Sequence, residues 1–96
     1  MMRIVWSPEA IGDLLALRAY IAEDDPAAAR RVAERIVSSV ETLLADNPAI
    51  GRPGRVPGTR EQVVTRTPYI LPYRVKDATI QVLRVYHGAR RWPDRF

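Results

Sequence analysis

The sequence predicts an α+β protein with the order β-α-α-β-β-β, in which a helical hairpin packs on a small, mainly antiparallel sheet. Two observations predict this class. Residues 8–47 carry apolar side chains at helical spacing, and residues 60–86 contain three β-rich runs separated by short turns. Helices grouped against one face of an antiparallel sheet bury the apolar surface of both layers, which is the α+β solution.

The N-terminal half predicts a strand at residues 3–6 and then two helices. Ser7 and Asp25 are suitable N-caps, and each is followed by a proline, which fits the first helical position. The second helix should end near Asn47, because Pro48 disfavours a helical conformation for the residue before it. The short link between the helices predicts an antiparallel hairpin. The apolar residues at helical spacing are Ala10, Ile11, Leu14, Leu15, Leu17, Ile21, Ala29, Val32, Ala33, Ile36, Val37, Val40, Leu43 and Leu44.

The C-terminal half begins with a loop at residues 48–59, which contain three prolines and three glycines. Strands are expected at residues 60–66, 69–76 and 79–86, with a two-residue turn at 77–78. That turn sets the register of the last hairpin, so that Arg74 faces Gln81 and Ile70 faces Val85.

This register divides the hairpin between two faces of the sheet. The more apolar face is the expected core, and it holds Leu71, Tyr73, Val75, Ile80, Val82 and Tyr86. The other face is half apolar and is interpreted as a groove for a partner segment, and it holds Ile70, Pro72, Arg74, Gln81, Leu83, Val85 and His87. Arg84 falls on the core face, which predicts either a salt bridge there or a bulge that shifts the register.

Length and composition exclude several classes of protein. Ninety-six residues are expected to form one domain, residues 1–96, around one modest core. The absence of cysteine excludes disulfides and thiolate catalysis, and one histidine leaves no structural zinc or other metal site. No apolar run approaches the roughly 20 residues of a membrane span, and the start leaves no room for a secretory leader, so a cytoplasmic protein is expected.

Charge is unevenly distributed along the chain. Residues 1–48 contain five Arg and eight Asp or Glu, a net charge of −3, whereas residues 49–96 contain nine Arg, one Lys and three acids, a net charge of +7. Arginine pairs well with phosphate and carboxylate and stacks on bases. The C-terminal half therefore predicts a surface for an anionic partner.

Several short motifs occur in a characteristic order: residues 6–10 (WSPEA), 47–48 (NP), 51–52 (GR), 68–75 (PYILPYRV) and 83–90 (LRVYHGAR). Their order and spacing resemble the RelE/ParE toxins of type II toxin–antitoxin pairs over essentially the whole chain. The closing segment is similar to the ParE branch. In addition, Ile70 stands where RelE-like nucleases tend to place a catalytic arginine.

The resemblance implies a toxin of plasmid- or chromosome-stabilising systems, neutralised in a hetero-oligomer by a ParD-like antitoxin. It implies inhibition of DNA gyrase by binding, with no catalytic residues, no cofactor and no membrane contact. The residues expected to meet the target are Arg84, His87, Arg90, Arg91 and Trp92. The residues expected to meet the antitoxin are Leu14, Leu17, Ile21, Ile70, Arg74, Leu83 and Val85.

The alternative is a ribosome-dependent mRNA endonuclease. Arg74 lies in a Tyr-Arg-Val context similar to that of a catalytic arginine in YoeB-like nucleases. His87 would handle a proton near neutral pH, and Glu61 would act as a base. The simpler expectations are that Glu61 pairs with an arginine and that Trp92 packs back on the helices. A third possibility is a relative that has lost toxicity and only binds its partner.

Overall fold

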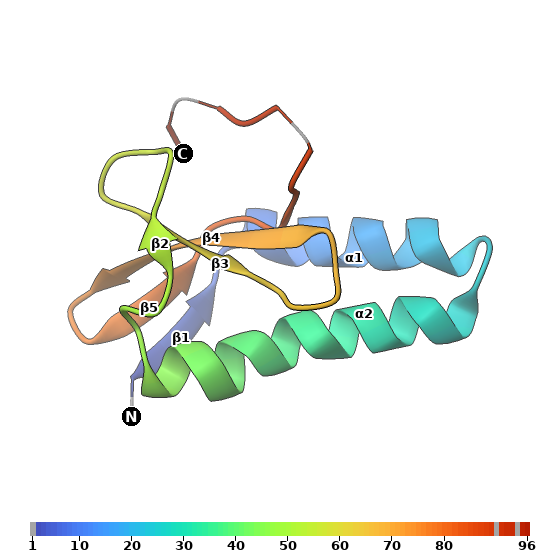
Figure 1. The fold of residues 1–96 in the computed structure, drawn as a ribbon, viewed down its shortest axis with the longest axis horizontal. Helices are drawn as coiled ribbons and strands as arrows, with labels where there is room; N and C mark the ends of the chain where they lie inside the picture. The colour runs from blue at the N-terminus through green and yellow to red at the C-terminus, as the bar shows by residue number, and fades with distance from the viewer. Residues whose placement is uncertain (1, 90, 94) are drawn as a thin grey trace.

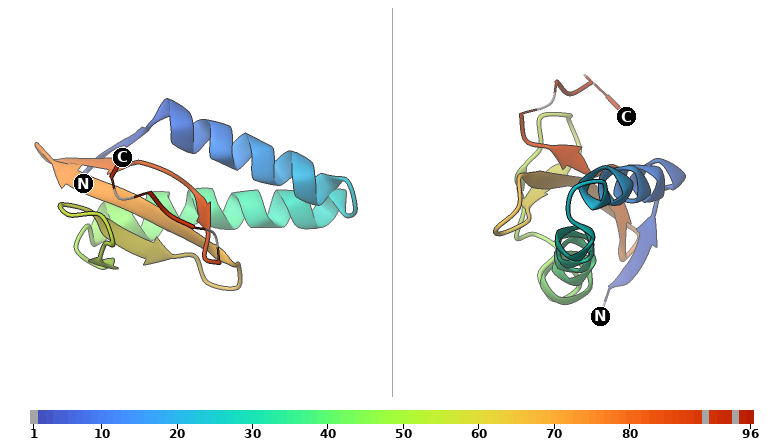
Figure 2. Two further views of the ribbon diagram at one scale, coloured as in Figure 1. Left: turned by 90° about the horizontal axis from the view of Figure 1, so that it is seen from above. Right: turned by 90° about the vertical axis from the view of Figure 1, so that its right-hand side faces the viewer.

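The computed structural model describes residues 2–89, 91–93 and 95–96. An antiparallel pair of helices packs on a six-stranded sheet of order β1-β5-β4-β3-β2, and β6 pairs with β4 (Figure 1, Figure 2). The β1–β5 pair is parallel and the other described pairs are antiparallel, so the predicted α+β class is confirmed. The elements are β1 (Arg3–Trp6), α1 (Pro8–Ala22), α2 (Pro26–Ser38), η1 (Ser39–Leu44), β2 (Arg52–Pro53), β3 (Arg60–Val63), β4 (Tyr69–Lys76), β5 (Thr79–Val82) and β6 (Tyr86–His87).

Both predicted N-caps are present. Ser7 Oγ accepts a hydrogen bond from Ala10 N at 2.9 Å, and Asp25 Oδ1 accepts one from Ala28 N at 3.0 Å. The Ser7 hydroxyl also donates to the carbonyl oxygen of Leu83 at 2.7 Å. The first cap therefore fixes the start of α1 to the far end of the hairpin, as well as satisfying a helix donor.

The second helical segment continues from α2 through the π-helical turn η1 to residue 46, and thus ends beside Asn47 as predicted. A π turn holds more residues than an α turn, so it offsets the drift of side chains placed four residues apart. Ile36, Val40 and Leu44 consequently stay on one fully buried face, while Leu43 is 41% exposed.

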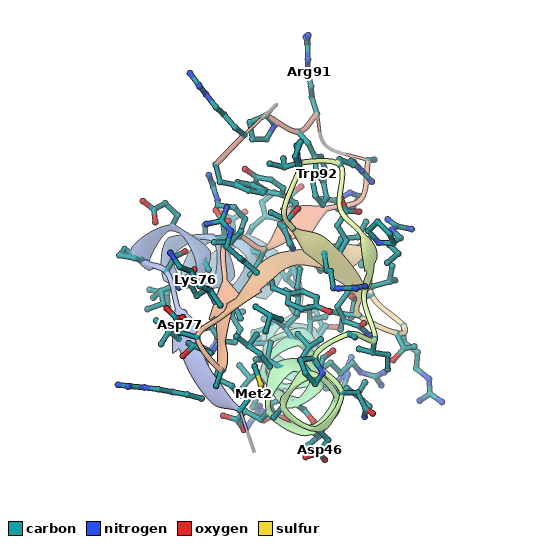
Figure 3. All side chains as sticks on the ribbon, turned by 90° about the vertical axis from the view of Figure 1, so that its left-hand side faces the viewer. Met2, Asp46, Lys76, Asp77, Arg91 and Trp92 are labelled. Carbon is teal, nitrogen blue, oxygen red and sulfur yellow. The ribbon has the colours of Figure 1, made fainter. Side chains whose placement is uncertain are left out.

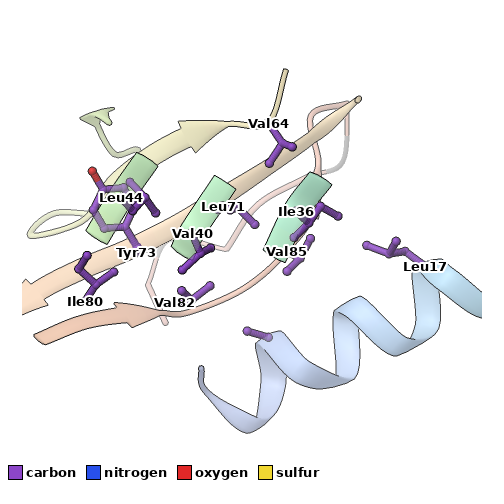
Figure 4. Packing of buried hydrophobic residues seen from close by; sticks show 11 residues of the cluster. Leu17, Ile36, Val40, Leu44, Val64, Leu71, Tyr73, Ile80, Val82 and Val85 are labelled. Atoms are coloured by element: carbon purple, nitrogen blue, oxygen red, sulfur yellow. The ribbon is translucent and has the colours of Figure 1, made fainter. Parts of the chain in front are cut away.

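The core lies between the helical pair and one face of the sheet (Figure 4). Its buried members are Ala10, Leu17, Ile36, Val40, Leu44, Val64, Leu71, Tyr73, Ile80, Val82 and Val85. The Tyr73 hydroxyl donates to Pro48 O at 2.7 Å and accepts from Gly51 N at 2.9 Å, which ties the loop after the helices to β4. Burial raises the pKa of Tyr73, so the phenol remains a donor. A Cβ at Gly51 would lie 2.6 Å from that hydroxyl, so only glycine fits there.

The turn at Asp77 and Ala78 is confirmed, since Lys76 pairs with Thr79 and Arg74 pairs with Gln81. Both turn residues have positive φ, at 51° and 55°, as a type I′ hairpin turn requires.

The prediction of one continuous strand at residues 79–86 is wrong. β5 ends at Val82 and β6 begins at Tyr86, and Ile70 pairs with Tyr86 rather than with Val85. The chain gains one residue between the two pairings, which is a β-bulge. The bulge reverses the predicted faces beyond it, so that Val85 enters the core instead of the groove and Tyr86 leaves it.

Arg84 was expected either to form a salt bridge or to lie at a bulge, and the structure shows both. Its Nε and Nη2 atoms donate to Asp13 Oδ2 and Oδ1 at 2.8 and 2.9 Å, and Val85 N donates to Asp13 Oδ2 at 3.0 Å. The hydrogen bond with Asp13 raises the pKa of Arg84 above its usual range. One carboxylate on α1 therefore fixes both the arginine and the backbone of the bulge.

The structure also differs from the predictions for the loop, for the end of β3 and for three core residues. The expected loop at residues 48–59 contains β2, whose Arg52 pairs with Glu61 of β3, and β3 ends at Val63 rather than at residue 66. Ile11 and Leu15, expected mainly in the core, are 47% and 60% exposed, because α1 is apolar on more sides than the sheet can cover. Val75, expected in the core, is 43% exposed near the hairpin turn.

We expect Asp13→Ala to lower the free energy of unfolding by about 2–3 kcal/mol, because it removes charge-assisted hydrogen bonds and leaves Arg84 half-buried without its partner. Urea unfolding followed by circular dichroism measures this. The exposed acid Asp46 is the control, and Asp46→Ala should change stability by no more than about 0.5 kcal/mol. Equal effects of the two substitutions would contradict a structural role for Asp13.

Candidate functional site

One candidate surface is the outer side of the helical pair, which we call the helical groove. It is a depression of about 450 Å³ lined by Leu14, Leu15, Arg18, Arg30, Ala33, Glu34, Val37, Ser38 and Glu41. Leu15 is 60% exposed at its floor, and Ile11, one turn earlier on α1, is 47% exposed. Apolar side chains thus continue along α1 beyond the groove itself, over a surface that no other described element covers.

The second candidate surface is the face of the sheet turned away from the helices. Here the described residues of the C-terminal tail, 88–89, 91–93 and 95–96, lie beyond β6 on the side of the loop between β2 and β3 (Figure 1). Trp92 is directed back toward the protein, whereas Arg91 projects away from it (Figure 3). The Trp92 ring lies 4.9 Å from the Tyr86 ring in an edge-to-face contact, and the Arg55 guanidinium lies 3.9 Å from the Trp92 centroid. The predicted packing of Trp92 on the helices is therefore wrong, because the bulge has turned Tyr86 to this face.

Glu61 holds Arg55 in place beneath the tail. Its side chain is 1% exposed, and its Oε1 accepts hydrogen bonds from Arg52 at 3.1 and 3.2 Å. Its Oε2 accepts one from Arg55 N at 2.7 Å, and Arg55 Nε lies 3.7 Å from Oε1. The expected pairing of Glu61 with neighbouring arginines is confirmed, and both carboxylate oxygens are engaged.

The three residues named for nuclease chemistry do not meet. Glu61 pairs with Pro72, on the same sheet face as Arg74. His87 pairs with Tyr69, whose side chain points to the opposite face, because side chains alternate along a strand. Tyr69 also precedes Arg74 by five residues, about 17 Å of extended chain. The expected sharing of one face by Arg74 and His87 is therefore wrong.

His87 instead belongs to a small hollow of about 250 Å³ at the end of the core, lined by Asp13, Ala16, Leu17, Tyr20, Tyr69, Val85 and His87. Its ring meets Tyr69 edge-to-face at 5.7 Å, and its Nδ1 accepts a hydrogen bond from Ala89 N at 3.2 Å. Burial, and then the nearby Tyr20, raise the pKa of Tyr69. The sequence singled out His87 but neither Tyr20 nor Tyr69, because the bulge decides that His87 lies on their side of the sheet.

The five residues predicted to contact the target are dispersed. Arg84 is bound to Asp13, Trp92 is enclosed by Arg55 and Tyr86, and His87 lies on the other face. Arg91 is exposed. Arg90 lies outside the described residues.

The residues predicted to contact the antitoxin fall into three groups. Leu14 lines the helical groove and Ile21 is half-buried near the end of α1. Arg74 and Leu83 line a pocket beside the tail. The remaining three are at most 8% exposed, and they are Leu17, Ile70 and Val85. Ile11, expected mainly in the core but within an apolar surface broader than one stripe, is exposed, and so is Tyr20, which was not named as a site residue.

Within residues 2–89, 91–93 and 95–96, no group of three or more His, Cys, Asp or Glu side chains could hold a metal ion. Over the same residues, no helix is both long and apolar enough to cross a membrane.

Comparisons with known proteins agree with one another. Residues 4–92 match the family described as the ParE toxin of type II toxin–antitoxin system, parDE. The chain is 46% identical to the Y4kP protein of Sinorhizobium fredii, over 95% of this chain and 93% of that one. It is 36% identical to toxin RelE2 of Caulobacter vibrioides, over 94% of this chain and 99% of that one.

Two solved structures have similar folds. A chain of the chromosomal ParDE system from Pseudomonas aeruginosa superposes with a TM-score of 0.79 at 36% identity, covering 91% of this chain and 96% of that chain. A chain of the RelBE2 toxin–antitoxin complex from Mycobacterium tuberculosis gives a TM-score of 0.66 at 27% identity, covering 90% and 96%.

We expect Glu61→Ala to reduce the free energy of unfolding by about 2–3 kcal/mol, because Arg52 and the Arg55 amide lose a buried acceptor. It should also release Arg55 from Trp92, which a red shift of Trp92 fluorescence in a Trp6→Phe background would report. Gln62→Ala, at the next residue, is the control. An unchanged emission maximum in Glu61→Ala would show that Glu61 does not support the tail.

Proposed function

Because the chain belongs to the family of ParE toxins of type II toxin–antitoxin systems, we propose that an antitoxin holds it inactive and that the free toxin binds and inhibits DNA gyrase. The proposed partner is a ParD-like antitoxin, and the proposed complex is a hetero-oligomer. The setting is the cytoplasm, where gyrase works, and the biological outcome is stabilisation of the plasmid or chromosome that carries the pair. No cofactor takes part.

The helical groove is the observation that supports an antitoxin partner. Leu14, Leu15 and Val37 give it an apolar floor, and charged side chains of both signs stand around them. An amphipathic helix places apolar side chains one turn apart, which matches the spacing of Ile11 and Leu15 on α1. The antitoxin helix would therefore bury the apolar surface of α1 that the toxin leaves exposed.

The dispersal of the nuclease candidates supports binding rather than chemistry at the target. Phosphodiester cleavage needs cations and a proton-transfer group around one phosphate. Arg74 and His87 point from opposite faces, and Glu61 has both oxygens occupied by arginine side chains and a backbone amide. An inhibitor that acts by binding needs no such convergence, and the basic C-terminal half suits a complex of gyrase and DNA.

The second candidate function is ribosome-dependent mRNA cleavage. Arg74 has no acidic partner within ion-pair distance in the described part of the chain, so its guanidinium is available to a phosphate. His87 is exposed, and its hydrogen bond from Ala89 engages only Nδ1.

We expect Leu15→Glu to raise the dissociation constant for the antitoxin about 100-fold, because the change buries an unpaired charge in an apolar interface. Val75→Glu is the matched control, since Val75 is a comparably exposed apolar residue beside the hairpin turn, and it should bind normally. Isothermal titration calorimetry with antitoxin from the neighbouring gene gives both values. Equal affinities for the two variants would rule out the helical groove as the antitoxin site.

The target is tested by giving purified toxin to two assays in parallel, gyrase supercoiling of relaxed plasmid and mRNA integrity in a translating extract. We expect loss of supercoiling at stoichiometric toxin with intact mRNA, and we expect His87→Ala to remain inhibitory. Cleaved mRNA with normal supercoiling would instead establish the nuclease alternative. In that case His87→Ala and Arg74→Ala should each abolish cleavage.

A further inference from the structure

A pocket of about 410 Å³ lies where the C-terminal tail passes over the start of α1 and the middle of the hairpin. We call it the tail pocket. Four parts of the chain line it: the start of α1, β4, the bulge and the tail. The residues are Ser7, Glu9, Arg74, Leu83, Arg84, Pro93, Arg95 and Phe96.

The described lining of the tail pocket carries more basic than acidic side chains. Among the described residues that line it, three are arginines and one, Glu9, is acidic. Arg84 is already paired with Asp13. Arg74 is half-buried and Arg95 is exposed, and neither has an acidic partner within ion-pair distance among the described residues. A guanidinium partly withdrawn from water is stabilised by an anion that it can hold with two parallel hydrogen bonds.

Apart from Ser7, the uncharged described residues of the tail pocket are apolar, namely Leu83, Pro93 and Phe96. Phe96 is 42% exposed and lies 6.2 Å from the buried Tyr86 ring. A nucleic-acid strand would need cations repeated along its phosphates and free aromatic faces for its bases. A single carboxylate carried beside an apolar side chain matches this wall better, and Glu9 at the rim disfavours a long polyanion.

The tail pocket depends on the folded position of the tail, because the tail supplies Pro93, Arg95 and Phe96. The tail is held by Trp92, whose ring lies beneath the Arg55 guanidinium and meets the Tyr86 ring edge-to-face. The indole Nε1 of Trp92 is buried and has no hydrogen-bond partner among the described residues, so contacts of the ring with Arg55 and Tyr86 hold it in place. Trp92 lies outside the pocket wall and would act as a positioning residue.

We propose that the tail pocket binds a carboxylate side chain of an acidic, apolar segment of a partner protein, with Arg74 and Arg95 as its ligands and Trp92 as the residue that positions the tail. The inference rests on the proposed function in one respect: the antitoxin is the partner that would supply such a segment. The pocket is separate from the helical groove, so one antitoxin could occupy both.

The test uses the full chain and three fluorescent probes of twelve units each: a peptide of alternating Glu and Leu, the same peptide with Gln for Glu, and a single-stranded RNA. Fluorescence anisotropy gives a dissociation constant for each probe. We expect the Glu–Leu peptide to bind most tightly of the three probes. Arg74→Ala should raise its dissociation constant about tenfold, because one charge-assisted pair is lost. Arg31→Ala removes the same charge from an exposed position on α2 and should weaken it less than twofold.

Two further variants test the positioning role. Trp92→Ala should weaken binding of the Glu–Leu peptide as much as Arg74→Ala does. Trp92→Phe should keep most of the affinity, because a ring can still meet Tyr86 edge-to-face. Leu15→Glu should bind the peptide normally, which separates the tail pocket from the helical groove. If the Leu15→Glu variant loses antitoxin binding but keeps peptide binding, both the helical groove and the tail pocket are supported as separate sites. If the wild-type protein binds no antitoxin, the proposed function fails, and peptide binding still tests the tail pocket independently.

Three results would overturn the inference. Equal weakening by Arg31→Ala and Arg74→Ala would mean that the peptide senses only overall charge. Tighter binding of RNA than of peptide, with dependence on Arg74, would assign the pocket to phosphate. Absence of binding at millimolar peptide would show that the tail pocket holds no carboxylate segment.

Discussion

The carboxylate of Asp13 is the contact on which the arrangement of the C-terminal half depends. It accepts hydrogen bonds from the Arg84 side chain and from Val85 N, and so holds the bulge between β5 and β6 against α1. Because side chains alternate along a strand, one additional residue exchanges the faces of everything beyond it. Val85 therefore completes the core, and Tyr86 becomes the support for Trp92 on the opposite face.

A second buried carboxylate, Glu61, holds the other side of the same surface. It anchors Arg55 over the Trp92 ring, while the Arg84 guanidinium lies 4.8 Å from the Tyr86 ring. Several basic side chains of the C-terminal half are thus engaged in contacts within the protein itself. Arg52, Arg55, Arg60 and Arg84 bind carboxylates or backbone carbonyls, whereas Arg74, Arg91 and Arg95 have no such partner in the described part of the chain. The surface available to an anion is therefore smaller than the sequence suggests. Arg66, in the turn before β4, and Lys76, the last residue of β4, also have no carboxylate partner among the described residues, and Arg74 and Arg95 lie together at the tail pocket.

Features encoded by neighbouring residues could be predicted, and features that depend on distant contacts could not. The helix starts at Ser7 and Asp25 and the turn at Asp77 follow from local chemistry, and each is present. The bulge depends on Asp13, 71 residues before Arg84, so an uninterrupted strand was the natural expectation. That single offset also explains the errors at the candidate site: it separates His87 from Arg74 and turns Trp92 away from the helices.

The separation of His87 from Arg74 is the central claim, because it favours binding over catalysis. Backbone nuclear Overhauser effects across β4 and β6 in isotopically labelled protein test it most directly. We expect cross-strand contacts that join Tyr86 to Ile70 and His87 to Tyr69, as the bulged register requires. Contacts that join Val85 to Ile70 would contradict this account, since they would remove the bulge and return His87 to the same face as Arg74.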